Sequence, residues 1–117
     1  MDFKEELKVY QQKVNKELEK YIRNEDCPEK ILNESMEYSL MAGGKRLRPI
    51  LVISTYELFA KDIEICMPYA VAIEMIHNLI LIHDDFPGID NDDFRHRKPT
   101  NHKMFNEATA ILAGDSL

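Results

Sequence analysis

Residues 67–95, MPYAVAIEMIHNLILIHDDFPGIDNDDFR, combine a long apolar run with five aspartates that follow it directly. Such a run is typical of a buried helix. Asp84 and Asp85 then lie at the carboxyl end of that helix, where the helix dipole is already negative. Because two adjacent carboxylates at this end need a cation, the segment predicts a site for a metal ion and a phosphate group.

A single polar stripe follows this predicted helix. On a helical wheel, the strongly polar residues other than His83 fall within an arc of about 120°, and they are Glu74, His77, Asn78, Asp84 and Asp85. A solvent-facing stripe would carry several lysines and glutamates, and only Glu74 is of that kind. We therefore favour the wall of a cavity with its mouth at the aspartates, and a solvent-facing stripe is the alternative.

The spacing of the aspartates bears on the kind of metal. Asp90 cannot share a face with Asp84 on an unbroken helix, since six residues turn the chain through about 600°. Pro87 and Gly88 break the helix and allow the chain to bring Asp90 back. Carboxylates without His or Cys ligands suit Mg²⁺ better than Zn²⁺. An acidic surface turn is the alternative, and an EF-hand is excluded because its alternating Asp/Asn-Gly pattern is missing.

Basic residues flank the acidic segment on both sides, as Lys45, Arg46 and Arg48 before it and Arg95, Arg97, Lys98 and Lys103 after it. Gly43 and Gly44 would let backbone amides approach an anion that the cations then hold. Ordinary capping of a helix by glycine is the alternative. The net charge of −6, from 15 basic and 21 acidic residues, argues against general nucleic-acid binding.

Helical spacing of apolar residues extends over most of the 117-residue chain, and no alternating strand pattern competes with it. The sequence therefore predicts a single all-α domain. The expected helices cover residues 3–22, residues 28–42 after a break at 26–28, residues 49 to about 60, residues 68 to the aspartates and residues 107–117, with a loop over 89–103. The last pattern stops without a C-cap, so we expect it to pack against a segment or partner absent from this chain.

Composition also predicts the cellular compartment. Cys27 and Cys66 lack metal-ligand spacing and are expected to be free thiols in a reducing compartment. The acidic N-terminus does not look like a signal peptide. The apolar stretch Met67–Ile82 contains polar residues and is too short to span a bilayer. We expect a soluble, cytoplasmic protein.

Residues 43–49, GGKRLRP, and 84–95, DDFPGIDNDDFR, together resemble the trans-isoprenyl diphosphate synthases. The second stretch is similar to the first aspartate-rich motif of that family, in the bacterial farnesyl diphosphate synthase form. Residues 98–103 and 107–115 also look like family sequence. The resemblance implies the N-terminal part of a polyprenyl synthetase domain, within an isoprenoid-synthase-type helical bundle. The second aspartate-rich motif of the family is missing from residues 1–117.

The resemblance implies a Mg²⁺-dependent prenyltransferase of isoprenoid biosynthesis, similar to geranyltranstransferase. The family joins an allylic diphosphate, dimethylallyl or geranyl, head to tail to isopentenyl diphosphate and yields farnesyl or geranylgeranyl diphosphate. Metal and arginines would stabilise the departing pyrophosphate, and a dry apolar wall would protect the allylic cation. Family members are usually homodimers. We expect the 117-residue chain alone to be inactive.

The resemblance also assigns roles by motif position. It assigns Asp84, Asp85 and Asp90 to Mg²⁺ as the catalytic groups, Gly44, Lys45, Arg48 and His77 to isopentenyl diphosphate, and Arg95 to the allylic diphosphate. Where the family has Arg-Arg-Gly, this chain has Arg95-His96-Arg97, so His96 takes the place of an arginine expected to bind isopentenyl diphosphate. An imidazole cannot make the bidentate pair of a guanidinium, and Arg97 offers a substitute from the next position. Leu79 and Ile80 replace the aromatic residue common in farnesyl-forming enzymes, which leaves the product length open.

Two alternatives belong to other functional classes. The first is a truncated, non-catalytic paralogue that serves as partner subunit of a full-length synthase, which His96 would also fit. The second is a metal phosphohydrolase of the HD type that uses His77 with His83 and Asp84. The wheel argues against the phosphohydrolase, because His77 and His83 face roughly opposite ways.

Overall fold

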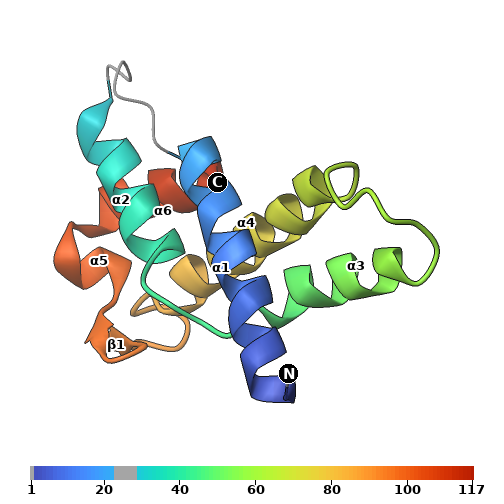
Figure 1. Cartoon of the computed structure of the whole chain (residues 1–117). Helices are drawn as coiled ribbons and strands as arrows, with labels where there is room; N and C mark the ends of the chain where they lie inside the picture. The colour runs from blue at the N-terminus through green and yellow to red at the C-terminus, as the bar shows by residue number, and fades with distance from the viewer. Residues whose placement is uncertain (1, 23–28) are drawn as a thin grey trace.

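The computed structural model describes residues 2–22 and 29–117, which form helices and one small hairpin (Figure 1). In chain order the elements are α1 (Phe3–Ile22), α2 (Lys30–Leu40), α3 (Leu47–Glu57), α4 (Met67–Asp84), β1 (Phe94–Arg95), β2 (Lys98–Pro99), α5 (Asn101–Met104) and α6 (Glu107–Ser116). The predicted all-α class is confirmed. Within the described ranges, none of the helices has the length and hydropathy needed to cross a bilayer.

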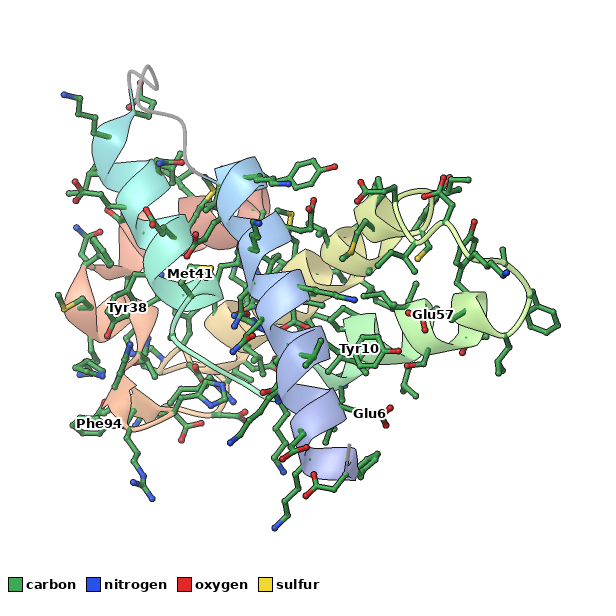
Figure 2. All side chains as sticks on the ribbon, in the orientation of Figure 1. Glu6, Tyr10, Tyr38, Met41, Glu57 and Phe94 are labelled. Carbon is green, nitrogen blue, oxygen red and sulfur yellow. The ribbon has the colours of Figure 1, made fainter. Side chains whose placement is uncertain are left out.

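Helix α4 lies at the centre of the fold and contacts α1, α2, α3 and α6. The core forms where one face of α1, with Val14, Leu18 and Ile22 at intervals of four residues, meets the apolar residues of the neighbouring helices. Those partners include Leu40, Ile53, Ala70 and Val71. On the other side of the core, the Tyr10 hydroxyl donates to Glu57 over 2.9 Å and joins α1 to α3 (Figure 2).

The helices begin and end at slightly different residues from those that the sequence predicted. Pro49 and Pro68 do not open their helices but stand third in α3 and second in α4, within first turns whose N–H groups have no helical acceptor. Helix α3 ends at Glu57, earlier than the predicted Ala60. The predicted start of the second helix at residues 26–28 lies outside the described residues. Cys66 is a free thiol, as predicted, and it is buried. The same prediction for Cys27 lies outside the described residues.

Residues 89–103 were predicted to be a loop, but they contain the hairpin β1–β2 and the short helix α5. The strands pair antiparallel, with Arg95 opposite Lys98, around a two-residue turn at His96 and Arg97. The Tyr38 hydroxyl on α2 donates to the Pro99 carbonyl over 2.6 Å and holds the hairpin against α2 (Figure 2). Two paired residues per strand are too few for an alternating pattern, so periodicity could not predict these strands.

We predict that Leu18→Ala lowers the free energy of unfolding by about 2–5 kcal/mol, because it leaves a cavity in the core where Leu18 is fully buried. The matched change Leu58→Ala removes a side chain that is 79% exposed, and its effect should stay within about 0.5 kcal/mol. Urea denaturation followed by circular dichroism measures both values. Equal losses for the two variants would contradict the core described above.

Candidate functional site

A cavity of about 280 Å³ opens between α4, the 43–48 segment and the hairpin. We call it the basic cavity. Its lining includes all six residues predicted to bind substrate, and these are Gly44, Lys45, Arg48, His77, Arg95 and His96. They come from three separate parts of the chain, and the fold brings these parts together around one cavity. Their roles in binding stay predictions.

The glycine turn brings the 43–48 segment close to the hairpin. Gly43 and Gly44 have φ angles of 119° and 115°, which side chains rarely adopt. A Cβ atom on Gly44 would lie 3.7 Å from Nε2 of His96. The imidazole of His96 therefore covers the turn, at the position where the resemblance expects an arginine. Arg97 is exposed and is not part of the lining.

His77 and Arg48 meet across the basic cavity, with 3.4 Å between Nε2 of His77 and a guanidinium nitrogen of Arg48. Burial lowers the pKa of His77, and the positive charge of Arg48 lowers it further. A neutral imidazole whose Nε2 accepts from Arg48 is the form that suits this contact. His77 thus helps to orient a cation and adds no charge of its own at neutral pH.

Asp85 is engaged by the hairpin. Its carboxylate is 3% exposed and accepts two hydrogen bonds from Arg95, 2.8 Å from Nε to Oδ2 and 2.7 Å from a terminal nitrogen to Oδ1. Hydrogen bonding to this carboxylate raises the pKa of Arg95. Asp85 therefore fixes the guanidinium that lines the basic cavity, and its predicted contact with a metal stays a prediction.

Asp84 faces a different environment from Asp85. With Ile73, Ile76, Ile80 and Leu81 it lines a second cavity of about 360 Å³, which also touches Arg48 and His77. We call it the apolar cavity. The polar stripe predicted the wall of a cavity with its mouth at the aspartates. Of its residues, Glu74, His77 and Asn78 line the basic cavity, and His77 and Asp84 line the apolar cavity.

The segment after α4 returns over the end of the helix. The amides of Asp90, Asn91 and Asp92 donate to the carbonyls of Asp84, Phe86 and Asp85, respectively, over 2.9–3.0 Å. These bonds satisfy carbonyls that the helix itself leaves without donors. The break at Pro87 and Gly88 thus lets the chain turn back, as the sequence predicted, so that the backbone of Asp90 meets the backbone of Asp84. A shared metal between their carboxylates stays a prediction.

The carboxylates at the end of α4 offer Mg²⁺ only part of a ligand shell. Within residues 2–22 and 29–117, no three His, Cys, Asp or Glu side chains are grouped closely enough to hold a metal by themselves. Mg²⁺ usually takes only one or two carboxylates and completes its shell with water and substrate phosphate oxygens. Asp84 and Asp90 fit that requirement, whereas both oxygens of Asp85 accept from Arg95.

Arg46 is a site residue that the sequence analysis missed. It was grouped with Lys45 and Arg48 as a basic cluster, but it is 3% exposed and pairs with Glu74 on α4 over 2.7 Å. The signal was present, because a single glutamate on an apolar helix requires a partner if it is buried.

His83 lies on the opposite side of α4 from the basic cavity. Its Nε2 is 3.4 Å from the Ile111 carbonyl and 3.6 Å from Asp115, both on α6. A Cβ atom on Gly114 would collide with the imidazole of His83, so any larger residue there would force this side chain to shift. His83 and His77 therefore do not share a site, which removes the geometry that an HD-type phosphohydrolase needs.

Known proteins are similar to this chain in sequence and in fold. Residues 29–117 match the polyprenyl synthetase family. The chain is 54% identical over 111 residues to the farnesyl diphosphate synthase of Geobacillus stearothermophilus, which covers 95% of this chain and 37% of that protein. It is 53% identical over 116 residues to the chloroplastic geranylgeranyl pyrophosphate synthase of Catharanthus roseus, covering 99% of this chain and 32% of that protein.

Solved structures agree with these relatives. The apo crystal structure of a FPP/GFPP synthase from Zymomonas mobilis matches with a TM-score of 0.90 and 42% identity, over 97% of this chain and 41% of that one. A geranyltransferase from Legionella pneumophila matches with a TM-score of 0.91 and 42% identity, over 97% of this chain and 40% of that one. The fold is thus that of an isoprenoid-synthase-type helical bundle. The chain belongs to the polyprenyl synthetase family and spans about a third of the length of the curated relatives it matches.

We predict that His77 titrates below its usual pKa of 6.5, and that Arg48→Met moves the pKa of His77 back towards that value. Because the unfolded chain binds a proton near pH 6.5 that the folded chain resists, stability from the neutral imidazole is present above the unfolded pKa. It is lost as the pH falls towards the lowered folded value. Titration of the imidazole resonances by NMR measures both values. An unshifted His77 would contradict both its partial burial and its contact with Arg48.

Proposed function

We propose that this chain forms the N-terminal part of a Mg²⁺-dependent prenyltransferase that joins an allylic diphosphate to isopentenyl diphosphate, of the farnesyl or geranylgeranyl diphosphate synthase type. The observation that carries the proposal is the junction of the two cavities. A basic cavity suited to a diphosphate lies beside an apolar cavity suited to a prenyl chain, and both are lined by Arg48, His77 and Leu81. The names and high identity of the relatives support the same activity.

Isopentenyl diphosphate is the proposed ligand of the basic cavity. Lys45 and Arg48 supply positive charge, and Gly44 brings backbone without a side chain to the lining of the same cavity. Arg95 lines the same cavity from the hairpin, where Asp85 fixes its orientation, and it would contact the allylic diphosphate. A guanidinium that is already oriented loses less freedom on binding than a free one.

The allylic substrate, dimethylallyl or geranyl diphosphate, would place its hydrocarbon against the apolar cavity. Ile73, Ile76 and Ile80 present branched carbon surface there and would exclude water from a carbocation. Asp84 and Asp90 would hold Mg²⁺, which when bound supplies positive charge to the diphosphate leaving group. In this proposal the full protein is a homodimer, in keeping with the resemblance of its sequence.

A second candidate function is a non-catalytic partner subunit of a synthase. His96 favours it, because an imidazole replaces the arginine that the family resemblance places at this edge of the basic cavity. The two candidates differ in turnover. Protein expressed from the full open reading frame, given both diphosphates and Mg²⁺, would release pyrophosphate only if the first function is correct.

We predict that Asp84→Ala combined with Asp90→Ala abolishes Mg²⁺-dependent binding of an allylic diphosphate, because it removes both carboxylates proposed to hold the ion. Isothermal titration calorimetry with and without Mg²⁺, on protein from the full open reading frame, measures the loss. Asp93→Ala is the matched control, since Asp93 is exposed and pairs with Lys103 on the surface. Undiminished binding by the double variant would count against the metal site.

We predict that His96→Arg tightens binding of isopentenyl diphosphate by about tenfold, the usual scale of one added charge-assisted hydrogen bond. The new guanidinium would start from a position that already covers Gly44 at the edge of the basic cavity. Arg97→His is the control, because Arg97 does not line the cavity. No gain from His96→Arg, together with a loss from Arg97→His, would mean that Arg97 already compensates.

A further inference from the structure

Arg46 stands inside the basic run but points away from solvent. The Arg46 side chain is 1% exposed, while Lys45 and Arg48 on either side of it are exposed. Burying a guanidinium is costly unless its charge is paired and its N–H groups find acceptors. The fold meets both conditions at this residue.

The guanidinium of Arg46 joins three helices. Its Nε donates to Asn15 on α1 over 2.8 Å, and its Nη1 donates to Glu74 on α4 over 2.7 Å. The other terminal nitrogen of Arg46, Nη2, donates to the carbonyl of Leu40, the last residue of α2. Asn78, one turn after Glu74, also donates to the Glu74 carboxylate over 3.3 Å. Arg46, Glu74 and Asn78 are buried, and all three also form part of the lining of the basic cavity.

The backbone at Arg46 is held in an uncommon form. Its φ is 57°, in the left-handed region that long side chains seldom adopt. Such a conformation persists only where the surroundings determine it, and the three partners of the guanidinium supply that constraint. A further bond, from the Gln11 side chain to the Lys45 carbonyl over 3.0 Å, holds the preceding residue.

The pair also spans the cavity walls. Glu74 lies three residues before His77 on α4, and Arg46 lies two residues from both Gly44 and Arg48. The distance between these walls, across which Arg48 meets His77, is thus set by a buried hydrogen-bonded pair that belongs to both walls. A small shift of this pair would displace the binding residues on both walls.

We propose that Arg46 and Glu74 are positioning residues for diphosphate binding, which hold Gly44, Lys45 and Arg48 in place opposite His77, and that Arg46 is not itself an anion ligand. This inference rests on the proposed function of the basic cavity. It assigns the three cations of the 45–48 segment to two different tasks, with Lys45 and Arg48 for the ligand and Arg46 for the geometry.

Substitutions at Glu74 separate positioning from direct contact. Glu74→Met removes the acceptor that Arg46 and Asn78 share, so a positioning role predicts at least tenfold weaker binding of inorganic diphosphate. Glu74→Gln keeps an acceptor of the same shape and should bind within about threefold of the unsubstituted protein. If Arg46 contacted the anion, both variants would bind more tightly, because each removes a negative charge beside it.

A double variant separates positioning from stability. Arg46→Met with Glu74→Met leaves no unpaired buried charge, and replacing a buried ion pair by apolar side chains is often neutral for stability. The proposal expects native circular dichroism and at least tenfold weaker diphosphate binding. The matched control is Lys103→Met with Asp93→Met, which removes an exposed pair and should bind normally.

The experiment is calorimetric titration of inorganic diphosphate into protein from the full open reading frame and its variants. Weaker binding by folded Glu74→Met and by the double variant, with recovery in Glu74→Gln, supports the positioning role. A folded double variant that binds normally, tighter binding by Glu74→Met, or a double variant that fails to fold would overturn it. Failure of the unsubstituted protein to bind diphosphate would overturn the basic cavity as an anion site, and the positioning role with it.

Discussion

The exposed carbonyls at the end of α4 are the constraint on which the site depends. A helix leaves its last carbonyls without donors, and here the amides of Asp90 and Asp92 donate to the carbonyls of Asp84 and of the C-cap residue Asp85. Meeting this requirement turns the chain back on itself after Pro87 and Gly88. The same turn places Asp90 beside Asp84 along the backbone and directs the following hairpin towards Asp85, where Arg95 binds. One need for hydrogen bonds thus organises both the acidic and the basic sides of the site.

The sequence predicted the helices well because their periodicity is a local property. Val14, Leu18 and Ile22 repeat at helical spacing, and they meet the core as expected. The hairpin could not be predicted in this way, since it is held by distant partners. Tyr38 contacts Pro99 over 61 positions, and the buried Ser35 hydroxyl donates to Asn101 over 66 positions. Such pairings depend on the assembled fold and leave no pattern in a short stretch of sequence.

The sequence named many of the residues that line the candidate site, but it did not distinguish the residues that face a ligand from those that hold the site together. Family resemblance named six of the residues that line the basic cavity, but not Arg46 or Glu74. Nothing in the run Lys45-Arg46-Leu47-Arg48 distinguishes the one buried cation from the two exposed ones, because the difference arises from Asn15, Leu40 and Glu74 on three other helices. In the same way, adjacent Asp84 and Asp85 look equivalent in sequence, yet only Asp85 accepts the paired bonds of Arg95.

The turn at His96 and Arg97 joins backbone geometry to the charge of the basic cavity. Two-residue hairpin turns with positive φ at both positions favour glycine and asparagine, and here the angles are 51° and 64° on a histidine and an arginine. A side chain in this region costs about 1–2 kcal/mol relative to glycine. The family resemblance places arginine and glycine at these positions, so this chain both strains the turn and weakens the cation above Gly44. Because the hairpin is held independently by Tyr38 and Asp85, it can tolerate this strain without losing the position of Arg95.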